Sequence, residues 1–112
     1  MTDKNTIAET QAYLKQADKL GISPEDRAAI KLFLSENPEA GDIIKGSGGV
    51  RKVRFAVGNK GKSGGLRLST FYWSSDYPLY LLTVIAKSRN ENLTDAQVAV
   101  LAQIVKELKD GR

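Results

Sequence analysis

The chain has 112 residues and a net charge of +4, and it contains neither cysteine nor histidine. These absences exclude disulfide bonds, thiol catalysis and metal sites built on Cys or His ligands, and they fit a cytoplasmic location. The length predicts a single domain over residues 1–112. No apolar run approaches the length of a membrane span, so no membrane segment is expected.

Helix signals dominate the first third of the chain. A weak strand pattern over residues 5–9 precedes apolar residues at helical spacing from 10 to 20. A second helix is predicted to begin after Ser23, with Pro24 at its first position, and to end at Asn37-Pro38. Residues 41–49 then read as a glycine-rich connector.

Strand signals follow in the second half, before a final helix. Strands are predicted over residues 50–57, 66–74 and 79–87, and the last of these is apolar on both faces, which is typical of a central strand. Thr94 and Gln97 form a capping box at the start of the last helix. This order predicts an α+β fold, in which a small twisted, mainly antiparallel sheet packs against two N-terminal helices and one C-terminal helix.

The positive charge of the chain is concentrated in one stretch. Residues 43–75 carry seven basic residues and no acidic residue, whereas the rest of the chain has more acidic than basic residues. Such a patch repels itself unless it faces a polyanion, and phosphate backbones are the usual partner. The stretch therefore predicts nucleic-acid binding, with a solvated basic surface as the simpler alternative.

Strand alternation predicts where these basic side chains lie. Val53 and its alternate neighbours are apolar and should face the helices, which leaves Lys52 and Arg54 together on the other face. If Leu68 is buried in the next strand, Arg67 comes up on that same surface, and Lys87 lies at its rim. We expect these four cations to converge on one concave site.

The aromatic residues of the middle strand leave two possibilities open. Phe71 and Trp73 share a strand face with Arg67, so they either flank the basic surface as a stacking platform or are buried by strand twist. Tyr72 is a reserve candidate for proton transfer, with burial in the core as the alternative.

Several motifs resemble one protein family. The segments at 37–42, Gly48-Gly49-Val50-Arg51-Lys52-Val53-Arg54 and Gly61-Lys62-Ser63-Gly64-Gly65-Leu66-Arg67 are similar to the RelE/HigB branch of bacterial type II toxin–antitoxin toxins, as are 81–87 and 92–94. The resemblance runs from about Ile7 to Leu108. It implies a ribosome-dependent mRNA endonuclease that inhibits translation, needs no cofactor and is silenced by a cognate antitoxin, in some cases one with a helix-turn-helix domain.

The resemblance also implies roles for individual residues. Lys52, Arg54 and Arg67 match the cationic catalytic surface of the family. The predicted substrate-binding set comprises Arg51, Lys60, Lys62, Lys87, Arg89 and Tyr72.

RNA cleavage by the 2′-hydroxyl is feasible without histidine. Arginines stay charged and bind two oxygens of a phosphorane, and like charges around Lys52 favour its neutral form, which makes it a candidate base. The identity of the general base is left open. Two other functions are also compatible with the sequence, inhibition of DNA gyrase by a ParE-like toxin and passive nucleic-acid binding without catalysis.

Overall fold

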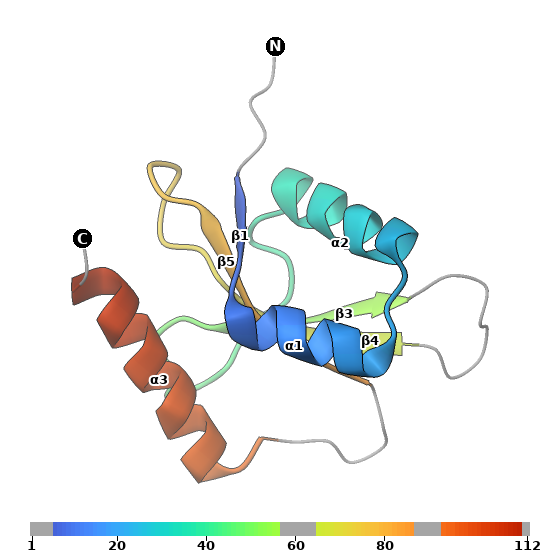
Figure 1. The fold of residues 1–112 in the computed structure, drawn as a ribbon. Coiled ribbons are helices and arrows are strands. Elements are labelled where there is room, and N and C mark those ends of the chain that lie inside the picture. The colour runs from blue at the N-terminus through green and yellow to red at the C-terminus, as the bar shows by residue number, and fades with distance from the viewer. Residues whose placement is uncertain (1–5, 57–64, 87–92, 111–112) are drawn as a thin grey trace.

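Three helices and five strands make up the part of the chain that the computed structural model describes, which is residues 6–56, 65–86 and 93–110 (Figure 1). In chain order they are β1 (Ile7–Glu9), α1 (Gln11–Leu20), α2 (Pro24–Glu36), β2 (Asp42–Ile43), β3 (Arg51–Ala56), β4 (Gly65–Phe71), β5 (Leu79–Ala86) and α3 (Asp95–Asp110). This arrangement confirms the predicted α+β class.

The five strands form one sheet in the order β1-β5-β4-β3-β2. β1 runs parallel to β5, and every other neighbouring pair is antiparallel. The interior position of β5 is the one expected from its apolar residues on both faces. The structure adds one short edge strand, β2, where the sequence indicated only a connector.

Each helix begins at a polar side chain that accepts a main-chain hydrogen bond. Thr10 Oγ1 accepts from the amide of Tyr13 at 3.2 Å, and Ser23 Oγ accepts from Asp26 at 3.0 Å. At α3 the predicted capping box forms, since Thr94 Oγ1 accepts from the Gln97 amide at 3.1 Å and Gln97 Oε1 accepts from the Thr94 amide at 2.8 Å. These local bonds satisfy amides that have no partner within the helix.

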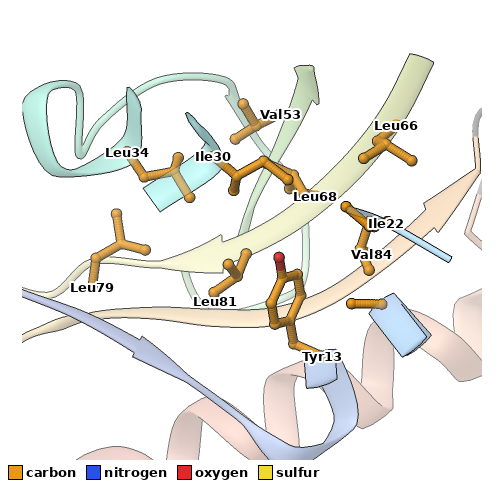
Figure 2. Packing of buried hydrophobic residues seen from close by; sticks show 11 residues of the cluster. Tyr13, Ile22, Ile30, Leu34, Val53, Leu66, Leu68, Leu79, Leu81 and Val84 are labelled. Atoms are coloured by element: carbon orange, nitrogen blue, oxygen red, sulfur yellow. The ribbon is translucent and has the colours of Figure 1, made fainter. Parts of the chain in front are cut away.

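The sheet buries apolar side chains on both of its faces, and different helices cover them. Figure 2 shows the larger cluster, in which α1 and α2 pack against β3, β4 and β5 through residues that include Tyr13, Ile30, Leu34, Val53, Leu68, Leu81 and Val84. α3 packs on the opposite face through Leu101 and Val105, and it is set apart from α1 and α2 in Figure 1. This face also receives Ile44, Val50, Phe71 and Leu82.

α3 covers only part of its face of the sheet. Its partners Val50 and Phe71 lie where β3 begins and where β4 ends. Arg54 and Arg67 lie toward the other ends of these strands, because Ala56 pairs with Gly65 there. α3 therefore packs mainly at the other end of these strands, and its first turn, with Asp95 and Val98, comes near Lys52 and Arg67 without covering Arg54.

A bulge in β5 explains how one strand serves both clusters. The register shifts between Ser69 and Thr70, so that Thr70 pairs with Leu81 and Ser69 with Thr83. Leu82 is the extra residue, and the alternation of side chains changes phase at this point. As a result, Leu81 and Val84 join the cluster under α1 and α2, whereas Leu82 joins the cluster under α3.

The glycine-rich connector between β2 and β3 is an ordered turn. The hydroxyl of Ser47, which is fully buried, donates to the Ile44 carbonyl at 2.6 Å and accepts from the Val50 amide at 2.9 Å. Gly46 and Gly48 have φ of 83°, and a Cβ on either one would lie 3.5 Å from Val98 or Val105, respectively. The turn therefore packs directly against α3 at Val98 and Val105.

Across the described ranges, no helix has both the length and the apolar character needed to cross a bilayer.

Tyr13 supplies a test of core packing. Its ring enters the larger cluster from α1, and its buried hydroxyl has no hydrogen-bond partner among the described residues (Figure 2). We expect Tyr13→Phe to leave the free energy of unfolding at pH 7 unchanged or to raise it by about 1 kcal/mol, because an unpaired buried hydroxyl is removed. Urea unfolding of the two proteins at pH 7 measures this difference, and a loss of more than 1 kcal/mol would contradict it.

The same variant has an expected pH dependence. Burial raises the pKa of the Tyr13 phenol above the ordinary value of 10.0, and the charge of Glu9 raises it further while Arg27 opposes the rise. Because the phenol ionises at a higher pH in the folded protein than in the unfolded chain, its contribution to the stability of the unaltered protein is complete below pH 10. That contribution is lost as the pH rises toward the folded-state pKa. The advantage of Tyr13→Phe should therefore grow above pH 10.

Candidate functional site

Three cations meet on the face of the sheet that carries α3, toward the end that the helix covers least. Arg54 on β3 and Arg67 on β4 are direct cross-strand partners, and Lys52 pairs with Ser69 one step along the same face. Side chains directly opposite each other on antiparallel strands have Cβ atoms about 4.5–5.5 Å apart, and diagonal neighbours remain within reach of long side chains. The expected convergence of Lys52, Arg54 and Arg67 is thus observed.

These side chains surround a cavity of about 420 Å³. Lys52, Arg54 and Arg67 line it together with Val53, with Asp42, the first residue of β2, and with Gly41, which precedes it. Asp42 is the cross-strand partner of Lys52, so one carboxylate stands beside the three cations. We call this cavity the cationic cleft.

The opposed positive charges in the cationic cleft lower the stability of the fold. Like charges directly opposite each other on a sheet are destabilising, and Arg54 and Arg67 occupy such positions. Lys52 and Arg54 are exposed, whereas Arg67 is half-buried. A bound anion would offset the repulsion between the two arginines, because guanidinium groups bind phosphate oxygens in pairs.

A second cavity of about 370 Å³ adjoins the first. Lys52 and Arg67 line both cavities, so the two share a wall. The remainder of the second cavity is mixed in character. Ile44, Ile85, Leu93 and Val98 give it apolar sides, Lys45, Ser69 and Thr83 add polar groups, and Asp95 stands at the start of α3. We call it the α3 pocket.

Close backbone approach at Gly41 holds the edge of the cationic cleft together. Gly41 has φ of 91°, and a Cβ placed on it would overlap the main-chain oxygen of Lys52. The Arg51 side chain donates from Nη1 to the Gly41 carbonyl at 3.2 Å. The short β2 strand is therefore pressed against β3 beside Lys52, which places Asp42 at the cleft.

Two of the residues predicted to bind substrate do not line either cavity. Arg51 alternates with Lys52 and is used to hold Gly41. Tyr72 packs against the cluster under α1 and α2, on the face opposite Arg67, so it does not lie on the surface that carries the cations. Four further predicted residues, Lys60, Lys62, Lys87 and Arg89, lie outside the described residues.

The two aromatic side chains left open by the sequence have different environments. Phe71 is 3% exposed and belongs to the cluster under α3, so it does not form a stacking platform. Trp73 is 43% exposed and stacks on Tyr77 with ring centroids 4.9 Å apart. Lys109 Nζ lies 5.5 Å from the centroid of the Trp73 ring. This aromatic pair lines neither cavity.

Sequence reasoning missed the acidic residues and one cation of the site. Asp42 lies directly before the basic stretch and lines the cationic cleft. Asp95 lies far beyond the stretch along the chain and lines the α3 pocket, and Lys52 and Arg67 line both cavities. Lys45 was counted in the charge of the stretch but was not assigned to a site, and it lines the α3 pocket. The signals for Asp42 were its position directly before the basic stretch and its place in the segment 37–42 that resembles the toxin family.

No cluster of three or more potential metal-ligating His, Cys, Asp or Glu residues occurs within 6–56, 65–86 and 93–110. No protein-family model matches the sequence.

Proposed function

We propose that this protein is the toxin of a type II toxin–antitoxin system and an endoribonuclease that cleaves mRNA on the ribosome. The observation that carries the proposal is the directly opposed pair of Arg54 and Arg67, with Lys52 beside it, around an open cleft of about 420 Å³. The resemblance of the surrounding motifs to the RelE/HigB branch supports the same function.

The cations suit the charged intermediate of RNA cleavage. Attack of a 2′-oxygen on the neighbouring phosphorus produces a phosphorane with two negative charges. Arg54 and Arg67 would bind its non-bridging oxygens from adjacent strands, and such preorganised charge is the largest single contribution to many enzymatic rates. Their fixed charge over the physiological pH range suits this role.

Asp42 and Lys52 suit the two proton transfers. In the proposed reaction the 2′-hydroxyl gives its proton to the Asp42 carboxylate as the new oxygen–phosphorus bond forms. The bond from phosphorus to the 5′-oxygen then breaks, and the leaving oxygen takes a proton from the Lys52 ammonium. The products are a 2′,3′-cyclic phosphate and a 5′-hydroxyl end. Because Asp42 supplies the base, Lys52 can act in its protonated form.

Such a site needs help with substrate geometry. In-line attack requires the 2′-oxygen, phosphorus and leaving oxygen to be aligned, and holding them there is worth roughly 7–11 kcal/mol. An open cleft on a small domain provides little of this, so the ribosome is the proposed partner that positions the mRNA. A cognate antitoxin in the cytoplasm would silence the toxin by covering or blocking the cationic cleft.

The test is cleavage of a translated message by the purified protein. We expect primer extension to map cuts at codon-spaced positions when ribosomes translate the message, with 5′-hydroxyl ends on the downstream fragments. Naked RNA of the same sequence should be cleaved little, because nothing aligns it for attack.

Three outcomes would contradict the proposal. Equal cleavage of naked and translated RNA would remove the role of the ribosome. After induction in a bacterial host, early loss of thymidine incorporation with intact methionine incorporation would point to gyrase. Binding of RNA without any cleavage would leave a passive nucleic-acid-binding module.

A further inference from the structure

The geometry points to the α3 pocket as the site that holds the base next to the cleaved phosphate, with Asp95 selecting guanine. This inference rests on the proposed function, since it assigns to RNA the polyanion of the cationic cleft. It adds a second subsite with its own recognition chemistry.

The position of the α3 pocket suits the base of a nucleotide whose phosphate lies in the cationic cleft. Lys52 and Arg67 form the wall between the two cavities. In this inference a phosphate held by these cations places its sugar at the boundary and its base in the adjoining space. The pocket volume of about 370 Å³ lies within the range of about 300–1,000 Å³ typical of small-ligand sites.

The α3 pocket combines polar groups from Lys45, Ser69 and Thr83 with apolar side chains that can face a planar base. Ile85, Leu93 and Val98 are half-buried, and Ile44 is 9% exposed, so the pocket offers apolar surface to the faces of a ring. RNA-binding proteins commonly hold unstacked bases between such surfaces and recognise them at their Watson–Crick edges.

Asp95 supplies the hydrogen-bonding edge. It is the first residue of α3 and lines the pocket, and its carboxylate is acceptor-only when ionised. Guanine presents two adjacent donors, N1–H and the N2 amino group, which match the two oxygens of a carboxylate. Adenine and cytosine present one amino group each, and uracil presents only N3–H. The expected order is guanine first, adenine and cytosine next, and uracil last.

Binding of mononucleotides tests the pocket without requiring catalysis. We expect the purified protein to bind guanosine 3′-monophosphate about tenfold more tightly than uridine 3′-monophosphate, as a paired hydrogen bond to a base provides. In NMR titrations the methyl signals of Ile85, Leu93 and Val98 should shift on binding. Asp95→Asn should abolish most of the preference and leave the affinity for the uridine nucleotide within twofold.

Asp26→Asn is the matched control. Asp26 stands in the first turn of α2, as Asp95 does in α3, so both variants remove an acidic group from a helix start. α2 packs on the other face of the sheet, so the preference for guanine should survive in Asp26→Asn. Equal affinity for the guanosine and uridine nucleotides in the unaltered protein, or an unchanged preference in Asp95→Asn, would overturn the inference.

The two proposals fail in different ways. A guanine preference that depends on Asp95, found in a protein that cleaves no message, would refute the endonuclease and keep the base pocket. Cleavage of translated mRNA with no difference in nucleotide preference between the unaltered protein and Asp95→Asn would keep the endonuclease and refute the pocket.

Discussion

Replacing Arg67 with alanine is expected to lower the rate of mRNA cleavage about 10²–10³-fold, the cost of removing one preorganised group from a developing anionic charge. Arg67 lines both cavities and stands opposite Arg54, and no other described residue does both. The rate is measured on translating ribosomes at saturating toxin, which separates the chemical step from binding.

The stability of Arg67→Ala should change much less than its activity. The substitution removes the repulsion between two opposed arginines, which offsets the loss of the contacts that the half-buried side chain makes. A shift of only a few degrees in the thermal midpoint is expected. If the variant unfolds at the assay temperature, its lost activity says nothing about catalysis, so Arg67→Lys serves as a second variant.

Arg67→Lys and a remote charge deletion complete this series. Lysine keeps the positive charge but not the paired donors, and its cleavage rate should fall between those of the unaltered protein and Arg67→Ala. Lys15→Ala removes one charge from α1, which covers the opposite face of the sheet, and its rate should stay within twofold. A loss of activity in Lys15→Ala equal to that in Arg67→Ala would show that only net charge matters.

Gly41→Ala is expected to disrupt the cationic cleft through the main chain. Gly41 has φ of 91°, and the added Cβ would overlap the Lys52 carbonyl oxygen and lie 2.8 Å from Val53 Cγ2. Left-handed strain and the clash together should destabilise the fold by about 2–3 kcal/mol. The cleavage rate per folded molecule should fall at least tenfold, because β2 must move away from β3 and carry Asp42 with it.

Gly21→Ala separates the clash from the strain. Gly21 also has a positive φ, 69°, at the end of α1, but a Cβ there meets no atom within 4 Å. This variant should lose about 1 kcal/mol of stability from strain alone and keep its cleavage rate. Denaturant unfolding and cleavage assays on both variants at a temperature where both are folded measure the contrast. Full activity per folded molecule in Gly41→Ala would show that the approach of β2 to β3 is not needed.

Features that depend on neighbouring residues were predictable. The caps at Ser23 and Thr94 are hydrogen bonds within three residues, so the sequence alone indicates these helix starts. The alternation of apolar Val53 with Lys52 and Arg54 has the period of a strand, and it correctly predicted which side chains share a face. The α+β class followed from the order of these local patterns.

Features that depend on distant residues were not predictable. The apolar stripe of α3 had two faces of the sheet available, since Leu81 is buried on one and Leu82 on the other, and the bulge that separates them appears only in the pairing of β4 with β5.

The features of the candidate site also fall into those that depend on neighbouring residues and those that depend on distant ones. Sequence by itself determined the charge of the surface and the common face of Lys52 and Arg54, because both depend on local composition and strand period. Only the tertiary structure decided that Arg67 lies opposite Arg54, that Asp42 and Asp95 flank the cations, and that Tyr72 does not. Strand register and the packing of α3 on the sheet bring these residues together although they are far apart in the sequence. No local sequence pattern predicts such long-range contacts.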